Sequence, residues 1–155
     1  MNVFITCVSE KASHRCKAKD IYTSALFKKC WEYAQTLNPD RIYILSAKHH
    51  LLNPNTEIDP YNVYMGDFSE DEKKEWAEEV YRQMKAAHID FKAKTYFFAG
   101  EDYIKYIRDY FPNRKEIFKD KAFGDILHWL DVRLPKKDIK EGLKSLADFL
   151  KESLE

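Results

Sequence analysis

The sequence predicts a single α/β domain with a small, mostly parallel sheet that is flanked by helices. Three short apolar runs, residues 3–8, 41–45 and 95–99, have the length and the β-branched or aromatic content of buried strands. The longer segments between and after them repeat apolar residues at helical spacing. Strands that alternate with helices are typical of an α/β fold.

The composition supports one folded domain over residues 1–155. Hydrophobic residues make up 45% of the chain and aromatic residues 15%, which is typical of a protein with a buried core and not of a disordered one. The 26 basic residues balance 26 acidic ones, so binding to nucleic acid would have to rest on a local patch. Three cysteines without C-x-x-C spacing and a short apolar start indicate a soluble, cytoplasmic protein that does not contact membranes.

The first predicted strand leads into a polar loop, and a helix follows that loop through about residue 37. The loop is locally basic, with Lys11, Arg15, Lys17 and Lys19. Thr23 or Ser24 is the expected N-cap of the helix, and an Asn-Pro pair stops it. Capping alone would explain Ser24, although Ser24 and Tyr22 are also placed to reach a ligand from the helix start.

The second predicted strand feeds the segment that we identify as the candidate site, residues 46–66. Ser46, Lys48, His49 and His50 follow the buried strand directly, and Asn53 and two prolines then turn the chain. Open α/β sheets bind ligands beyond the carboxyl ends of their strands. The segment therefore stands where a ligand is expected.

The remainder of the chain completes the fold. Ser69-x-x-Glu72 predicts a capping box that opens a helix to about residue 87. The third strand turns at residues 100–103 into a helix that carries Ile104, Ile107 and Tyr110. A short helix over residues 123–130 and an amphipathic terminal helix over residues 139–154 are expected after it.

The candidate segment resembles the YaaA-like family, which comprises the peroxide-stress protein and its small bacterial and phage relatives. The matching residues are Leu45-Ser46, His49, Leu51-Leu52, Pro54, Ile58-x-Pro60-Tyr61 and Met65-Gly66. His50 stands where that family usually has glycine. If the position needs a positive φ angle, His50 must adopt it at some cost in strain.

The resemblance extends to about Leu130. Tyr22-x-Ser24 resembles an element of the small relatives, Ala99-Gly100-x-x-Tyr103 resembles another, and the basic first loop resembles a segment that faces the family's site. The resemblance implies association with DNA and protection from oxidative damage. It implies no set of metal ligands.

The residue types exclude several chemistries. The chain has four glycines and no P-loop or Rossmann pattern, which argues against nucleoside triphosphate hydrolysis and dinucleotide redox chemistry. A Ser-His-acid combination is present without a G-x-S-x-G elbow. Adjacent His49 and His50 point apart on a regular element, so we expect no metal site and no other cofactor. Cys7, inside a strand, is expected to be an inert thiol.

What remains is acid–base or electrostatic chemistry around a planar ligand. Lys48, Asp59 and Ser46 are the candidate catalytic residues: Asp59 would stabilise an oxocarbenium-like state and Lys48 would be its electrostatic or nucleophilic partner. Tyrosines beside them suit a nucleobase, because rings stack on it while polar groups read its edge. The candidate substrate-binding residues are Ser9, Lys11, Lys19, Tyr22, Ser24, His49, Tyr61, Glu101 and Tyr103, of which Ser9, Lys11 and Lys19 would hold a phosphate.

Three functional hypotheses follow. The first is a protein that recognises a nucleobase in DNA or a nucleotide and cleaves its N-glycosidic bond, as a DNA glycosylase does. The second is a non-catalytic DNA-binding module of the stress response, and the third is a small-molecule hydrolase. Taken singly, Lys48 has the alternative role of capping the strand end, and Asp59 that of bracing the turn. The sequence sets no oligomeric state.

Overall fold

A five-stranded sheet forms the centre of the fold in the computed structural model, which describes residues 1–6 and 11–135. β1 pairs in parallel with β3 and with β6, β6 pairs in parallel with β7, and β4 runs antiparallel to β3. The expected α/β fold with a mostly parallel sheet is therefore confirmed. In spatial order the strands are β4 (His50–Leu52), β3 (Arg41–Ser46), β1 (Asn2–Thr6), β6 (Thr95–Phe98) and β7 (Arg114–Glu116).

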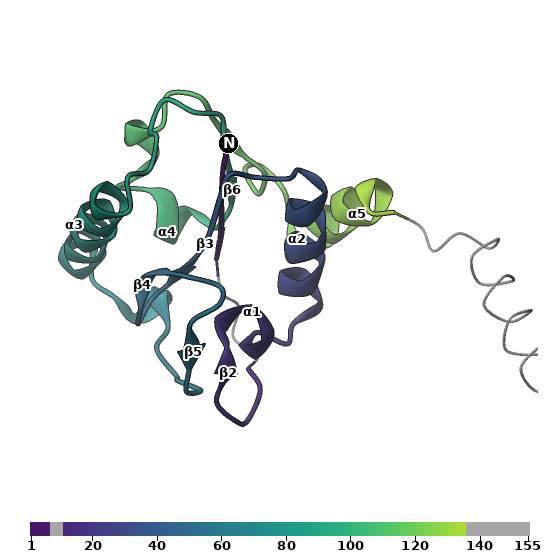
Figure 1. Ribbon diagram of the computed structural model, residues 1–155, viewed down its shortest axis with the longest axis horizontal. Coiled ribbons are helices and arrows are strands. Elements are labelled where there is room, and N and C mark those ends of the chain that lie inside the picture. Colours follow the sequence, from purple (N-terminus) through teal and green to yellow (C-terminus); the bar gives the residue numbers. More distant parts are fainter. Residues whose placement is uncertain (7–10, 136–155) are drawn as a thin grey trace, which may run out of the picture.

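Helices cover both faces of this sheet (Figure 1). α2 (Ala25–Thr36) and α5 (Phe123–Arg133) lie on one face. α3 (Glu70–Ala86), α4 (Glu101–Ile104) and the 3₁₀ turn η2 (Arg108–Tyr110) lie on the other. Because both faces are covered, the central strands are buried throughout rather than alternately.

Successive residues of the central strand enter the two cores alternately. Val3 and Ile5 pack toward α2 and α5, whereas Phe4 packs toward α3. Phe4 stacks on Phe97 at 5.4 Å and meets Phe111 edge-on at 5.5 Å between ring centroids. These aromatic contacts fix β1 and β6 against the same layer of helices.

A second, two-stranded sheet lies beyond the carboxyl ends of the main strands. β2 (Cys16–Lys17) pairs antiparallel with β5 (Glu57–Ile58), and α1 (Ala18–Ile21) follows β2 directly. Figure 1 shows all three below the main sheet, at the end opposite the amino terminus. After β5 the chain continues to the 3₁₀ turn η1 (Met65–Asp67), whose Met65 packs in the core on the face of α3 and α4.

The predicted helix starts are confirmed at two positions. The Ser24 side chain accepts a hydrogen bond from the Phe27 backbone N–H at 3.1 Å and caps α2. Ser69 and Glu72 form the expected reciprocal capping box at the start of α3, with hydrogen bonds of 3.0 and 3.1 Å.

Other expectations need correction. The helix predicted through Tyr110 is two pieces, α4 and η2, because the chain leaves the helical path after Ile104. Lys105 and Tyr106, in the interruption, both contact Glu70 of α3. Strands β2, β4, β5 and β7 were not predicted. The amphipathic segment 139–154 lies outside the described residues, as do Cys7 and Ser9.

Candidate functional site

The order of the strands defines a topological switch point at the carboxyl end of the sheet. The chain leaves β1 toward β3 with α2 on one face, and leaves β6 toward β7 with α4 on the other. Neighbouring strands whose connections diverge in this way form the switch point at which open α/β sheets bind ligands. The hydroxyl of Thr6, at the end of β1, donates to the Phe98 carbonyl of β6 at 3.3 Å and ties the two strand ends together.

A chain of hydroxyl groups lies at this end of the sheet. The Tyr61 hydroxyl is 2.7 Å from that of Tyr22 and 2.8 Å from Oγ of Ser46. The Ser46 hydroxyl, at the end of β3 and fully buried, also accepts the backbone N–H of His49 at 3.0 Å. Three segments that are distant in sequence thus meet through Tyr61.

Cationic and imidazole side chains surround the Tyr61 ring. The Nζ atoms of Lys11 and Lys48 lie 4.6 and 5.8 Å from its centroid, within range of a cation–π attraction. The His49 ring meets it edge-on at 5.2 Å. We call these side chains, together with the hydroxyl groups bonded to Tyr61, the Tyr61 cluster. Its members are Lys11, Tyr22, Ser46, Lys48, His49 and Tyr61.

The surroundings of His49 favour its neutral form. Burial lowers the pKa of His49 below its usual 6.5, and the charges of Lys48 and His50 lower it further. Its Nε2 atom is buried and has no hydrogen-bond partner within the described chain. Buried polar atoms are rarely left unpaired, so a water molecule or a ligand atom that bonded this nitrogen would be favourable.

A layer of aromatic side chains supports the cluster from α3. The indole N–H of Trp76 donates to the Ser46 carbonyl at 2.9 Å. His50 stacks on the same indole at 6.3 Å, and Tyr103 meets it edge-on at 5.6 Å. His50 has a φ of 61°, so this position does adopt the backbone conformation that favours glycine. Burial lowers the pKa of His50, against an opposing effect of the Glu79 charge.

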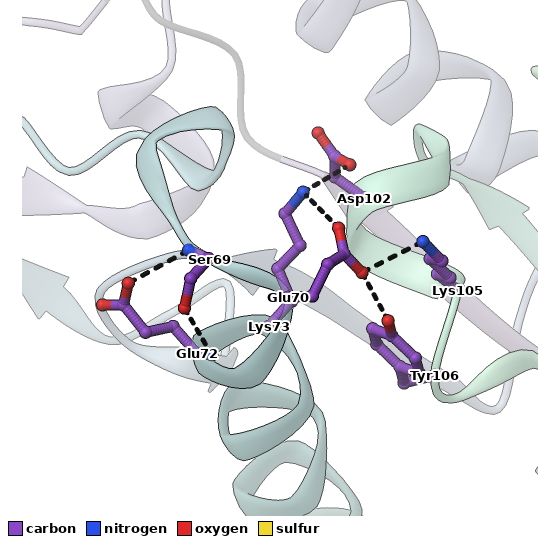
Figure 2. Close-up of polar contacts among 7 residues, drawn as sticks. All are labelled: Ser69, Glu70, Glu72, Lys73, Asp102, Lys105 and Tyr106. Carbon is purple, nitrogen blue, oxygen red and sulfur yellow. Dashed lines mark hydrogen bonds and ion pairs between the residues drawn. The ribbon is translucent and has the colours of Figure 1, made fainter.

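An ion-pair network fixes α4, and with it Tyr103, against α3 (Figure 2). Lys73 Nζ lies 3.2 Å from Glu70 and 3.0 Å from Asp102, and the Lys73 side chain is only 11% exposed. Glu70 also accepts from Lys105 and from the Tyr106 hydroxyl. The Tyr106 hydrogen bond, followed by those from Lys105 and Lys73, lowers the pKa of Glu70 to about 2.

The two predicted carboxylates each contact an arginine. Asp59 lies 3.0 Å from Arg15 and its side chain is 69% exposed. Glu101 binds Arg108 through both carboxylate oxygens, and this hydrogen bonding lowers the pKa of Glu101. Within the described chain, the Tyr61 cluster itself consists of hydroxyl, imidazole and ammonium groups.

The other predicted binding residues lie partly in or beneath the Tyr61 cluster and partly outside it. Lys11, Tyr22, His49 and Tyr61 belong to the Tyr61 cluster, and Tyr103 lies in the aromatic layer beneath it. Lys19 lines a separate surface pocket, and the hydroxyl of Ser24 is engaged as the α2 cap.

The sequence did not identify Trp76 as part of this region, and it placed Arg15 in the basic first loop without indicating its ion pair with Asp59. Trp76 reads as one apolar position among several on α3, and Arg15 as one of four loop cations. One local feature of the sequence pointed to the aromatic layer: His50 stands where the YaaA-like motif usually has glycine. In the structure, His50 is the residue that stacks on Trp76. Among the described residues, no three His, Cys, Asp or Glu side chains are grouped to hold a metal ion.

Comparison with known proteins identifies one family. A family model described as "Family of unknown function (DUF6884)" matches residues 3–132, which is most of the chain. Neither the curated proteins nor the solved structures contain a match. Within the described residues, each helix is too short or too polar to cross a membrane.

Proposed function

The chain belongs to the family of unknown function DUF6884, and we propose that it recognises a nucleobase carried by a phosphate-bearing ligand, a nucleotide or nucleic acid. The observation that carries the proposal is the Tyr61 cluster at the carboxyl end of the sheet. It combines a partly buried aromatic ring, two ammonium groups and an imidazole nitrogen that has no hydrogen-bond partner in the described part of the chain. The likeness to the YaaA-like family and the stress-response role that it implies remain predictions.

The chemistry of the cluster suits the two parts of a nucleotide. A planar base stacks on an aromatic ring, and the His49 imidazole would bond its polar edge by turning its buried Nε2 atom toward it. Lys11 and Lys48 supply positive charge for a phosphate. An apolar small molecule would leave these polar groups unpaired, at a cost of about 1–3 kcal/mol for each buried one.

Hydrolysis of the N-glycosidic bond is a second candidate, with Asp59 as its carboxylate. The observation that favours it is the position of Asp59, two residues before Tyr61 and 69% exposed. A carboxylate beside the sugar would stabilise the oxocarbenium-like state and activate water. The ion pair with Arg15 must open for this to occur, and that requirement favours recognition without cleavage as the first candidate.

Binding of deoxynucleoside monophosphates to Lys48→Ala tests the first candidate. We expect the affinity to fall roughly five- to tenfold, equivalent to about 1–1.4 kcal/mol, because an ammonium group near the phosphate is lost. Lys85→Ala is the matched control, since Lys85 Nζ lies 4.5 Å from the Tyr81 ring on α3. Equal affinities of Lys48→Ala, Lys85→Ala and wild type would refute the assignment.

Base release tests the second candidate. DNA containing normal and modified bases is incubated with wild type and Asp59→Asn, and released base is measured by mass spectrometry. Release that disappears in Asp59→Asn but persists in Asp131→Asn would establish hydrolysis, because Asp131 is likewise an exposed, ion-paired carboxylate. If DNA is bound but no base is released from any substrate, the second candidate is refuted and recognition without cleavage remains.

A further inference from the structure

A groove with two lobes lies beside α2, outside the Tyr61 cluster. The larger lobe, of about 410 Å³, lies between α2, the start of β3 and the turn at residues 53–55. The smaller lobe, of about 340 Å³, lies between α1 and α2. Lys19 and Trp31 line both lobes, so the two adjoin each other.

The larger lobe combines an indole ring, carboxamides and positive charge. Trp31 stacks on Phe27 with centroids 6.4 Å apart and an angle of 17°, which fixes the plane of the indole at the junction. Lys19 and Arg41 contribute positive charge. Asp40 also lines this lobe, but its carboxylate is 2.6 Å from the amino terminus, which compensates its charge. The carboxamides are those of Gln35, Asn53 and Asn55.

The smaller lobe adjoins the Tyr61 cluster through the buried side chain of Tyr22. Tyr22 lines this lobe, and its hydroxyl is hydrogen-bonded to that of Tyr61. Lys28 adds a cation there, whereas Asp20 and Glu32 add acids. The groove as a whole is therefore mixed in charge, and stacking and amide hydrogen bonds, more than charge, would hold a ligand in it.

The edge of the sheet is open along the larger lobe. β4 pairs with β3 only from Ile44 to Ser46. In the same register Ile42 would lie opposite Pro54, which has no N–H to continue the ladder. The strand edge at residues 41–43 thus borders the groove instead of a further strand.

We propose that this groove holds the strand that continues from a base bound at the Tyr61 cluster, so that the ligand is single-stranded nucleic acid. The inference rests on the proposed function and names its substrate class. Single-strand binders combine cations that follow the backbone with rings on which successive bases stack. Here Trp31 is the stacking residue, and Lys19 and Arg41 of the larger lobe, where the Asp40 carboxylate is paired with the amino terminus, are the cations.

The test compares ligands of different length on the full chain. Deoxynucleoside monophosphates, mixed-sequence single strands of about four to eight nucleotides and duplexes of the same length are titrated by calorimetry or fluorescence anisotropy. We expect single strands to bind at least about tenfold more tightly than monophosphates and more tightly than duplexes. Arg41→Ala and Trp31→Leu should each remove about fivefold or more of the single-strand affinity and leave monophosphate affinity unchanged.

Two further readouts guard against a folding artefact. Arg41→Ala, at an exposed strand start, should lower the slope of log affinity against log salt by about 0.7, which a general loss of structure would not do. Arg133→Ala is the matched control, because Arg133 lies 3.9 Å from the Trp129 ring on another helix, and it should leave every affinity unchanged.

The outcomes separate this proposal from the function on which it rests. Two outcomes would overturn the groove proposal alone while monophosphate binding still depends on Lys48. In the first, single strands bind no more tightly than monophosphates. In the second, single strands bind more tightly, but Arg41→Ala and Trp31→Leu do not change their affinity. Tighter binding of duplexes would also overturn it. A chain that binds neither monophosphates nor single strands would overturn both proposals.

Discussion

Tyr61 is the residue through which the separate segments of the site are connected. Its hydroxyl lies between those of Tyr22 and Ser46, both almost fully buried, and its ring faces Lys11, Lys48 and His49. A polar group that loses its partner in a buried place keeps the cost of its desolvation. The contribution of this one hydroxyl to stability should therefore exceed that of a surface tyrosine.

We predict that Tyr61→Phe lowers the free energy of unfolding by about 1–3 kcal/mol, because Ser46 and Tyr22 each lose a hydrogen bond. Tyr64→Phe is the control three residues away, with a side chain that is 64% exposed, and it should change stability by less than about 0.5 kcal/mol. Urea unfolding of both variants measures the difference. Equal stabilities would show that the hydroxyl chain contributes nothing to folding.

The pKa of His49 should respond to Lys48. Burial, followed by the charges of Lys48 and His50, lowers this pKa, so Lys48→Ala should raise it toward the usual 6.5 without restoring it fully. Titration of the imidazole resonances by NMR measures the shift, with Lys85→Ala as control. An unchanged pKa in Lys48→Ala would mean that the ammonium group does not act on His49.

All six members of the Tyr61 cluster were candidate site residues in the sequence, and four of them, Ser46, Lys48, His49 and Tyr61, lie in the segment after the second strand. Their meeting with Lys11 and Tyr22 follows from the switch point, where loops after different strands converge. The engagement of Asp59 by Arg15 and of Glu101 by Arg108 could not be foreseen. Which cation pairs with which carboxylate depends on tertiary proximity, and one sequence holds no record of that.

At the scale of elements, the junction of α3 with α4 determines how the aromatic layer stands under the site. Lys73 connects Glu70 on α3 with Asp102 on α4 (Figure 2). Tyr103 follows Asp102 directly in the sequence. The capping box at Ser69 fixes the first turn of α3 next to these groups. The network is therefore placed to hold Tyr103 against Trp76.

Glu70 should make stability depend on pH in the acid range. Its pKa is lowered from 4.5 to about 2 in the folded protein, so its stabilising contribution is fully present above about pH 4.5 and is lost as the pH falls toward 2. Glu70→Gln should accordingly melt at a lower temperature than wild type at neutral pH. The gap should close near pH 2.

Thermal melts from pH 2 to 7 measure this difference, and Glu75→Gln, on the exposed face of the same helix, serves as control. A constant gap between wild type and Glu70→Gln across that range would contradict an electrostatic origin.

Element prediction succeeded where a local signal was strong. The capping box at Ser69 and the Asn-Pro stop after α2 bound long amphipathic helices, which local rules describe well. The strands β2 and β5 have two residues each and β4 and β7 three, too few for a period-2 pattern to emerge. The break after Ile104 was missed because contacts of Lys105 and Tyr106 with α3 override an otherwise helical pattern.

At the scale of the whole molecule, the alternation of strands and helices predicted the fold class but not the order of the strands. The order β4-β3-β1-β6-β7 puts the first strand at the centre and creates the switch point beside it. This arrangement explains why the tyrosine after α1 and the tyrosine after β5 end up 2.7 Å apart at their hydroxyls. It also places the groove beside α2 next to the same site.

The most direct test of the central claim is an NMR titration of the isotope-labelled full chain with deoxynucleoside monophosphates. We predict that the largest amide shifts fall at Ser46, His49 and Tyr61. We also predict that Lys48→Ala lowers the affinity measured by the titration, whereas Lys85→Ala does not. Shifts confined to α5 or to the far end of α3, or a titration that is the same in all three proteins, would contradict the claim.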